Sequence, residues 1–271
     1  MAGAPRSLGP CGPGEPGVPG GPGGLHPERA GPSARRHDDR LQRRGAPAVG
    51  SRARATCPEP APPWRRPRPW PLPLATPRLL LDWWRPEHAP SLWEAIETSR
   101  STLAPWMPWA LTNHRDPEES LERIEAWARL RNAPEADEFF LGLFDRATGE
   151  VVGGAGLHRV LPALGQAEVG YWVREGRRGA GLCTEAVRAL VTSAFRDWGL
   201  RRIVIECAGD NVASRRVAEK ATLPLECVCR AARWVDLHGW SDELRFGVLA
   251  SEWDPQRQRR RDGVPAHRAP A

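Results

Sequence analysis

A glycine- and arginine-rich loop between an apolar strand and a helix constrains this chain more than any other stretch. The segment from Val169 to Ala186 reads VGYWVREGRRGAGLCTEA. Its apolar start ends at Val173, and a helical pattern begins at Leu182. The loop between them leaves backbone N–H groups accessible at a helix N-terminus, which is an environment that binds anions. The sequence therefore predicts a phosphate-binding loop in a fold that contains both strands and helices.

Residue type and spacing exclude two common nucleotide-binding loops. A Walker A loop requires GxxxxGK[ST], and the single lysine of the chain is Lys220. A dinucleotide-binding fingerprint requires GxGxxG, whereas Gly176, Gly179 and Gly181 have the reverse spacing, GxxGxG. The loop therefore belongs to another class of phosphate site.

Composition divides the chain into three parts. Residues 1–75 contain 17 of the 29 prolines and little apolar periodicity, so we predict a disordered extension. Residues 76–254 carry the pattern of one folded domain, and residues 255–271 form a basic tail, also predicted to be disordered. The net charge of +6 comes from the ends, because residues 76–255 carry a net charge of about −5. An acidic domain does not favour specific nucleic-acid binding.

Apolar runs and cysteines limit the remaining classes of protein. No stretch is long and apolar enough to span a bilayer or to resemble a signal peptide, so neither membrane insertion nor secretion is expected. The six cysteines form no CxxC pair, and Cys227 and Cys229 lack a nearby histidine, so we expect no metal site. Reduced thiols in a cytoplasmic protein fit this pattern.

The hydrophobic periodicity predicts a mixed α/β fold rather than a doubly wound one, because strands and helices do not alternate throughout. Asp116 and Gly199 are expected to begin and end helices. The expected strands cover 78–84, 139–144, 150–160, 168–173, 202–207, 227–237 and 243–249, and the expected helices cover 86–100, 117–131, 182–198 and 211–221.

Arg178 to Cys183, RGAGLC, matches the pattern [Q/R]-x-x-G-x-[G/A] except at its last position. It resembles the acetyl-CoA loop of the GCN5-related N-acetyltransferases (GNAT), and most closely their RimJ/RimL-type branch. Four further segments resemble that branch in consistent order: TPRLLL at 76–81, LAPWMPWA at 103–110, GYWV at 170–173 and NVASRRVAEK at 211–220. Departures from the family are Cys183, where a small residue is usual, and Thr222-Leu223, where Gly-Phe is usual.

The resemblance implies a twisted mixed sheet, flanked by helices, whose fourth and fifth strands splay apart around acetyl-CoA. The backbone of Trp172 and Val173 would pair with the pantetheine arm, and Asn211 would bind the arm, cap the last helix, or do both. The pyrophosphate would be held by the loop residues Arg178, Gly179, Ala180, Gly181, Leu182 and Cys183. No metal is implied.

Two residues are candidates for catalysis in that family's reaction. Glu168 lies on the cofactor-side strand, and it is either the general base or a surface acid of that strand. Ser214 matches the N-x-x-S position, and it either hydrogen-bonds the departing thiol or caps the helix. Tyr171, the single tyrosine, is expected to pack rather than to act as an acid.

The expected activity is acyl transfer from acetyl-CoA to a primary amine, with a protein N-terminus as the main candidate, by a monomer or homodimer. An α-amino group of pKa about 8 is roughly one-tenth neutral at pH 7, so it needs only modest base assistance. The alternatives are a small-molecule amine acceptor, such as a polyamine or aminoglycoside, and a catalytically weak acyl-CoA-binding module.

Overall fold

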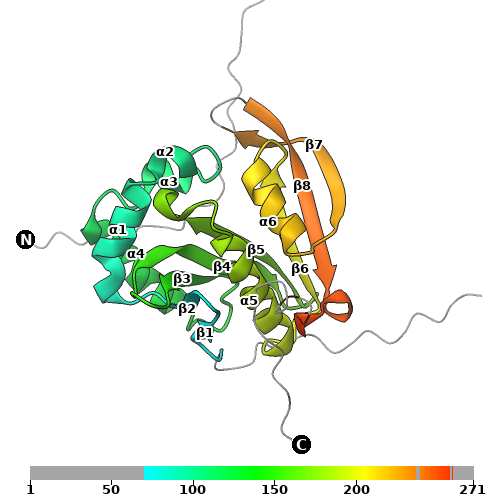
Figure 1. The fold of residues 1–271 in the computed structure, drawn as a ribbon, viewed down its shortest axis with the longest axis horizontal. Helices are drawn as coiled ribbons and strands as arrows, with labels where there is room; N and C mark the ends of the chain where they lie inside the picture. Colours follow the sequence, from blue (N-terminus) through cyan, green and yellow to red (C-terminus); the bar gives the residue numbers. More distant parts are fainter. Residues whose placement is uncertain (1–69, 236–238, 257, 259–271) are drawn as a thin grey trace, which may run out of the picture. The chain divides into compact units, whose positions relative to one another are not determined.

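A mixed eight-stranded sheet, in the order β1-β2-β3-β4-β5-β6-β8-β7, organises the described part of the chain (Figure 1). The structure is a computed structural model that describes residues 70–235, 239–256 and 258. The extension up to residue 69 and the tail from residue 259 lie outside these residues, so their predicted disorder stays a prediction.

The predicted order of strands and helices is confirmed, with a few short elements added. The strands are β1 (Leu74–Ala75), β2 (Leu79–Trp83), β3 (Phe139–Asp145), β4 (Val151–Leu161), β5 (Gln166–Val173), β6 (Arg202–Ala208), β7 (Leu225–Val235) and β8 (Gly239–Leu249). The α-helices are α1 (Ala89–Glu97), α2 (Arg100–Leu103), α3 (Trp109–Thr112), α4 (Pro117–Leu130), α5 (Leu182–Arg196) and α6 (Val212–Lys220), and 3-10 turns cover Pro86–His88, Glu175–Arg177 and Ala250–Glu252.

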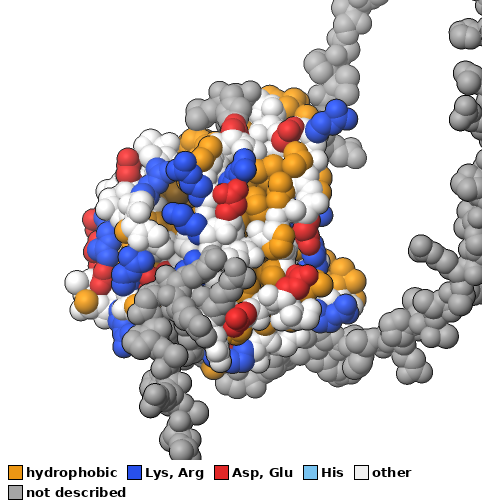
Figure 2. Space-filling model, turned by 45° about the vertical axis from the view of Figure 1, so that its right-hand side comes forward, with side chains coloured by type: hydrophobic (Ala, Val, Ile, Leu, Met, Phe, Trp, Pro, Cys, Tyr) orange, Lys and Arg blue, Asp and Glu red, His pale blue; other side chains and the backbone are white. Residues whose placement is uncertain are grey.

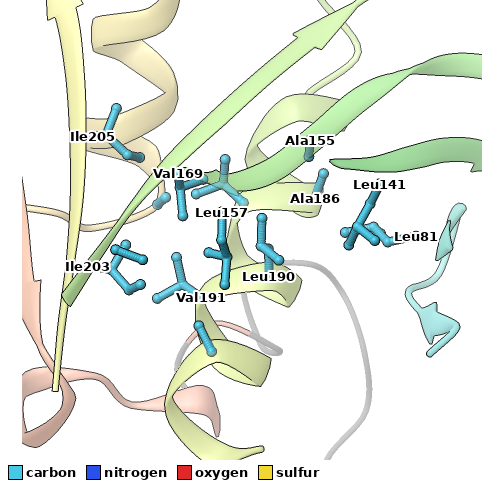
Figure 3. Packing of buried hydrophobic residues seen from close by; sticks show 14 of the residues in the cluster. Leu81, Leu141, Ala155, Leu157, Val169, Ala186, Leu190, Val191, Ile203 and Ile205 are labelled. Carbon is cyan, nitrogen blue, oxygen red and sulfur yellow. The ribbon is translucent and has the colours of Figure 1, made fainter. Parts of the chain in front are cut away.

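The two faces of the sheet bury separate apolar clusters because side chains alternate along each strand. Helix α5 packs on one face, where Ala186, Leu190 and Val191 meet strand residues such as Leu157 and Ile203 (Figure 3). On the opposite face α1 and α4 cover a second cluster, which includes Leu92, Ile96, Ile124, Phe144 and Val151. Each face therefore presents different side chains to the space between the central strands.

Strands β5 and β6 are parallel neighbours that pair over a short stretch only. Their pairing ends at Glu168 opposite Val204, although β5 continues to Val173 and β6 to Ala208. Beyond that point β5 still pairs with β4 through Gly153 opposite Val173. The predicted splay is confirmed, and it leaves the β6-facing edge of β5 without a strand partner.

The sequence pattern predicts that the folded domain starts at Thr76. In the structure, residues before Thr76 also belong to the domain. Trp70 is 8% exposed, and its indole Nε1 donates to Ser193 Oγ at 2.8 Å. Leu74 starts a short strand against β2 and joins the same core. Local sequence patterns could not reveal the Trp70 contact, because Ser193 lies 123 residues further along the chain.

The end of α6 explains how the chain tolerates Thr222 where the family usually has glycine. Thr222 has φ +68°, a left-handed conformation that ends helices and is unfavourable for a β-branched residue. Gln258, beyond the expected domain end at residue 254, is buried and donates to Thr222 Oγ1 at 2.7 Å. Gln258 therefore supports this turn.

Candidate active site

The glycine-rich loop ends in a left-handed turn that opens the N-terminus of α5. Gly179 and Gly181 have φ +77° and +79°, and Gly181 is the N-cap residue of α5. The first N–H groups of a helix lack intrahelical partners, so those after Gly181 are available to an anion. A Cβ at Gly179 would meet no atom within 4 Å, which shows that the loop faces open space. Phosphate binding by this loop stays a prediction.

The two arginines of the loop differ in their surroundings. Arg177 pairs with Asp145 and, at 3.0 Å, with Glu150, so it is directed to the β3–β4 turn. Arg178 is exposed, and within the described residues its guanidinium forms no ion pair. Arg178 is therefore the one whose charge remains available to an anion at the loop.

A residue pair that sequence reasoning missed holds this loop against the sheet. Arg78 donates from Nε to Glu185 Oε2 at 2.7 Å and from Nη1 to the Ala180 carbonyl at 2.8 Å. Glu185 is 4% exposed, and it also accepts from Thr76 Oγ1 at 2.6 Å. This cluster, which we call the Arg78 clamp (Thr76, Arg78, Ala180 and Glu185), fixes the position of the loop relative to the first turn of α5.

A cavity of about 210 Å³ lies where β5 and β6 diverge, and we call it the β5–β6 cleft. It joins both faces of the sheet, because Glu168 and Glu206 line it from the α4 side and Tyr171 and Ser214 line it from the α6 side. A second cavity, of about 120 Å³, extends towards the loop; it is lined by Trp172, Val173, Arg178, Cys183, Asn211 and Ser214. We call this second cavity the β5–α6 channel.

Ser214 and Tyr171 form a hydroxyl pair at the junction of the cleft and the channel. Their oxygens are 2.9 Å apart, and Tyr171 Oη also lies 3.1 Å from the Ser214 carbonyl oxygen. Burial raises the pKa of Tyr171 well above its usual range, so its hydroxyl keeps its proton. Asn211 accepts the Ser214 N–H at 3.0 Å, which is a helix cap, and it also lines both cavities.

Cys183 lies in the wall of the β5–α6 channel rather than in the loop itself. Its side chain packs partly buried against the α5-side core. Burial raises the pKa of its thiol to about 12, with a small opposing effect from Arg178. At neutral pH the thiol is therefore protonated, and its side chain forms part of the channel wall.

Glu168 is joined to a second carboxylate by an arginine. Arg159 pairs with Glu168 and with Glu206, and Glu206 also pairs with Arg245 at 2.7 Å. Burial and, to a smaller extent, the nearby Glu206 raise the pKa of Glu168, whereas Arg159 opposes that rise. Sequence reasoning found Glu168 but missed Arg159 and Glu206, whose positions depend on strand register. We call these three residues the Glu168–Arg159–Glu206 bridge.

A third cavity, of about 400 Å³, lies under α1 and α4 on the Glu168 face of the sheet. Aromatic side chains dominate its walls: Trp84, Trp109, Trp127, Phe140 and Trp172. His158 and Glu138 supply polar groups, with His158 Nδ1 3.7 Å from Glu138 Oε1. Trp109 lines this cavity and Trp106 lines the β5–β6 cleft, so the segment 105–109, which we call the aromatic loop, borders the candidate site.

Exposed apolar side chains flank the cleft on β7 and β8. Trp234 and Trp240 are 57% and 66% exposed, their rings meet edge to face at 5.4 Å, and Trp234 lines the cleft. Figure 2 brings this side forward and shows hydrophobic surface interspersed with acidic and basic side chains. The cleft thus has an apolar rim and a charged floor.

Comparison with known proteins decides the family. Residues 78–223, more than half of the chain, match the family described as an acetyltransferase (GNAT) domain. The chain belongs to the GNAT acetyltransferase family. It is accordingly an acyltransferase, and the resemblance noted from its loop and its ordered motifs is confirmed.

Two bacterial relatives illustrate the similarity of this GNAT protein to others. The ribosomal-protein-serine acetyltransferase of Escherichia coli is 26% identical over 149 residues, which cover 55% of this chain and 80% of that protein. The probable N-acetyltransferase YjcK of Bacillus subtilis is 32% identical over 115 residues, which cover 42% of this chain. The match spans 62% of YjcK, less than two thirds of its length.

Solved structures share the fold. RimL, a ribosomal L7/L12 alpha-N-protein acetyltransferase in complex with coenzyme A, superposes with a TM-score of 0.59 at 24% identity, covering 65% of this chain and 96% of that one. The microcin C7 self-immunity acetyltransferase MccE, in complex with acetyl-CoA and AMP, has a TM-score of 0.57 at 22% identity, covering 64% and 93%. At these identities the likeness shows the GNAT fold.

Neither a metal-ligand cluster nor a membrane-spanning helix occurs among the described residues. No group of three or more metal-ligating side chains occurs among them, and Cys227 and Cys229 are 3.7 Å apart at sulfur. No helix in this part of the chain is long and apolar enough to cross a membrane. The structure thus brings Glu168, Ser214, Asn211, Arg178 and Cys183 around two adjoining cavities.

Proposed function

We propose that this GNAT protein transfers the acetyl group of acetyl-CoA to the α-amino group at a protein N-terminus. The observation that carries the proposal is the β5–β6 cleft, which adjoins an anion-binding loop on one side and Glu168 on the other. Relatives named for acetylating ribosomal proteins support the choice of acceptor. A cytoplasmic location, where nascent N-termini and acetyl-CoA meet, is part of the same proposal.

The donor would bind along the β5–α6 channel. N–H groups from Gly179 to Cys183 would hold the pyrophosphate, and the helix dipole contributes about 0.3–1 kcal/mol to such an interaction. Arg178 would add a charge-assisted contact. The unpaired edge of β5 at Trp172 and Val173 would receive the pantetheine amides as an added strand. Acetyl-CoA itself supplies the activated acyl group.

Proton transfer would occur from the two faces of the sheet. Glu168 would accept the proton of the incoming ammonium group, directly or through a water, because it lines the acceptor side of the cleft. Ser214, paired with Tyr171, would donate a hydrogen bond to the departing thiol on the other side. A serine hydroxyl is too weak an acid for full proton donation, so this hydrogen bond is its main contribution.

The donor site can be tested by titrating the protein with coenzyme A in a calorimeter. The double variant Arg178→Ala/Gly181→Asp should lose binding, because it removes a cation and places a carboxylate at the helix N-terminus. Gly176→Ala is a matched control, since Gly176 has an ordinary φ and open space around it. Unchanged affinity in the double variant, with the fold intact by circular dichroism, would contradict the loop assignment.

The acceptor and the base can be tested by measuring release of coenzyme A. N-terminal peptides should be acetylated in preference to polyamines, aminoglycosides and free amino acids. Glu168→Gln should reduce the rate more at pH 6 than at pH 9, because a larger fraction of the amine is already neutral at pH 9. An effect of equal size at both pH values would argue against a base.

A small-molecule amine is the second candidate acceptor. The carboxylates of Glu168 and Glu206 in the cleft favour a cationic substrate of either kind. Preference for a polyamine or an aminoglycoside in the same screen would select it. Binding of acetyl-CoA without turnover on any amine would instead indicate an acyl-CoA-binding module.

A further inference from the structure

We propose that Arg159 is a positioning residue for the acetyl-transfer reaction: it bridges Glu168 and Glu206 and so holds Glu168 as an ionised carboxylate at the acceptor side of the cleft. The inference rests on the proposed function, because it concerns the group assigned there as the base. It begins from the path of β4, which is irregular at this residue.

Strand register places Glu168 and Glu206 on one face of the sheet. Glu168 lies opposite Val204 in the parallel pairing, and Glu206 follows Val204 by two residues. His158 lies opposite Glu168 in the antiparallel pairing, so it shares that face. In an unbroken strand the next residue, Arg159, would point to the α5 face.

A bulge in β4 turns Arg159 back to the carboxylates. The β4–β5 register shifts between His158 and Leu161, and Arg159 has φ +46°, which is uncommon for a residue other than glycine. The result is contact between its guanidinium and both Glu168 and Glu206. A strained backbone that aims one side chain at two acids of a cavity indicates a specific role.

The Glu168–Arg159–Glu206 bridge offsets the repulsion between two carboxylates in the cleft. Glu206 is 5% exposed at its side chain, and Glu168 is 20% exposed, so two carboxylates meet in a partly desolvated place. Without a cation in contact with Glu168, burial and the nearby Glu206 would favour its protonated form, which cannot act as a base. Arg159 supplies that cation, and its 60% exposure lets it move aside for an ammonium group.

Neighbouring charges do not replace Arg159. On β8, Arg245 pairs with Glu206, and Glu243 pairs with Arg233 of β7 at 2.9 Å. His158 on β4 is paired with Glu138, which precedes β3. The aromatic loop that lines the other wall contributes Pro105, Trp106, Met107 and Pro108 and no charge. Among the described residues, Arg159 is therefore the arginine in direct contact with Glu168.

The test is the pH profile of kcat/KM with one N-terminal peptide acceptor. Arg159→Leu should shift the acidic limb to higher pH by about one unit, and Arg159→Lys should restore most of the shift. Glu206→Gln should move the limb to lower pH, and the double variant should lie between the two single variants. Ionisation of the acceptor amine is common to all variants, so it cancels in the comparison.

Controls separate this inference from a structural role and from the proposed function. Arg129→Leu removes an exposed arginine from an ion pair on α4 and should leave the limb in place. A uniform loss of kcat/KM in Arg159→Leu, with the limb unmoved, would overturn the inference, as would an unmoved limb in Glu206→Gln. If Glu168→Gln keeps the acidic limb and full activity, the base assignment itself fails.

Discussion

Tyr171 lines the β5–β6 cleft, the β5–α6 channel and the third cavity, which lies under α1 and α4. The sequence favoured packing for this residue, and its ring does pack against the α5-side core. Its hydroxyl has a second use, because it fixes the hydroxyl of Ser214 on the donor side. Tyr171 thus orders Ser214, one of the two residues assigned to the proposed proton movements.

We predict that Ser214→Ala lowers kcat about tenfold and leaves the Kd for coenzyme A unchanged. The lost hydrogen bond to the thiol acts in the transition state, and a net hydrogen bond contributes about 0.5–1.5 kcal/mol. The Asn211 cap uses the backbone N–H of Ser214, so α6 keeps its N-terminus. Steady-state kinetics measures the change, with Ser101→Ala as an exposed control. An unaffected kcat in Ser214→Ala would contradict the proposed role.

A second residue-scale prediction concerns stability at low pH. His114 is buried beside Ser120, and burial lowers the pKa of its imidazole from 6.5 to about 4. In the unfolded chain His114 binds a proton below pH 6.5, whereas in the folded chain it stays neutral down to about pH 4. The contribution of neutral His114 to the free energy of unfolding is therefore complete above pH 6.5. This contribution, about 3 kcal/mol, is lost as the pH falls to about 4.

His114→Asn should flatten this part of the stability curve, since asparagine does not titrate and tolerates the φ of +58° at this position. Urea denaturation at pH 7, 6, 5 and 4 measures the difference in slope between the two proteins. Parallel curves for the variant and the parent would show that His114 is not the group responsible.

At the scale of secondary-structure elements, the position of the glycine-rich loop depends on a contact from the start of β2. The Arg78 clamp joins residues that are about a hundred positions apart, so local sequence patterns could not reveal it. The clamp fixes a loop whose glycines would otherwise permit many conformations. Rigidity at the donor site therefore comes from outside the motif that identifies it.

Arg78→Ala should raise the Kd for coenzyme A severalfold, with little change in kcat at saturating donor. The loop would still form but would need ordering when the donor binds, which costs affinity. Arg85→Ala, which breaks an exposed pair with Asp82 on the same strand region, is the matched control. Equal donor affinity in the two variants would show that the clamp does not support the loop.

Features that depend on neighbouring residues in the sequence could be predicted, whereas features that depend on distant residues could not. Periodicity and caps placed the central strands and long helices, and the Asp116 cap is confirmed by its bond to the Glu119 N–H at 2.7 Å. The expected helix from Pro86 to Arg100 is instead a turn and two helices, since Ser99 interrupts it. Arg159 and Glu206 could not be found, because a bulge and a parallel register decide where they point.

At the scale of the whole domain, its N-terminal boundary is set by aromatic packing. Trp70 packs on Trp198 with ring centroids 4.4 Å apart and contacts Phe139 edge to face. Because Trp70 lies in a proline-rich stretch, the sequence pattern placed it in the predicted disordered extension. Chains cut on either side of Trp70 test this boundary directly.

A chain that starts at residue 76 should be less stable than one that starts at residue 59, by about 3–5 kcal/mol, the usual cost of removing a buried tryptophan. Trp70→Ala in the full-length chain should lose a similar amount. Chemical denaturation followed by tryptophan fluorescence measures both. Equal stability of the two truncated chains would mean that residues 70–75 only rest on the domain.

The splay between β5 and β6 has a kinetic consequence. Ser214, on the proposed donor side, and Glu168, on the proposed acceptor side, reach one cleft from opposite faces of the sheet. Both substrates can therefore occupy the protein together, and the Cys183 thiol, with its high pKa, is unsuited to carry an acyl group between two half-reactions. Initial-rate plots at varied donor and acceptor should therefore intersect rather than run parallel.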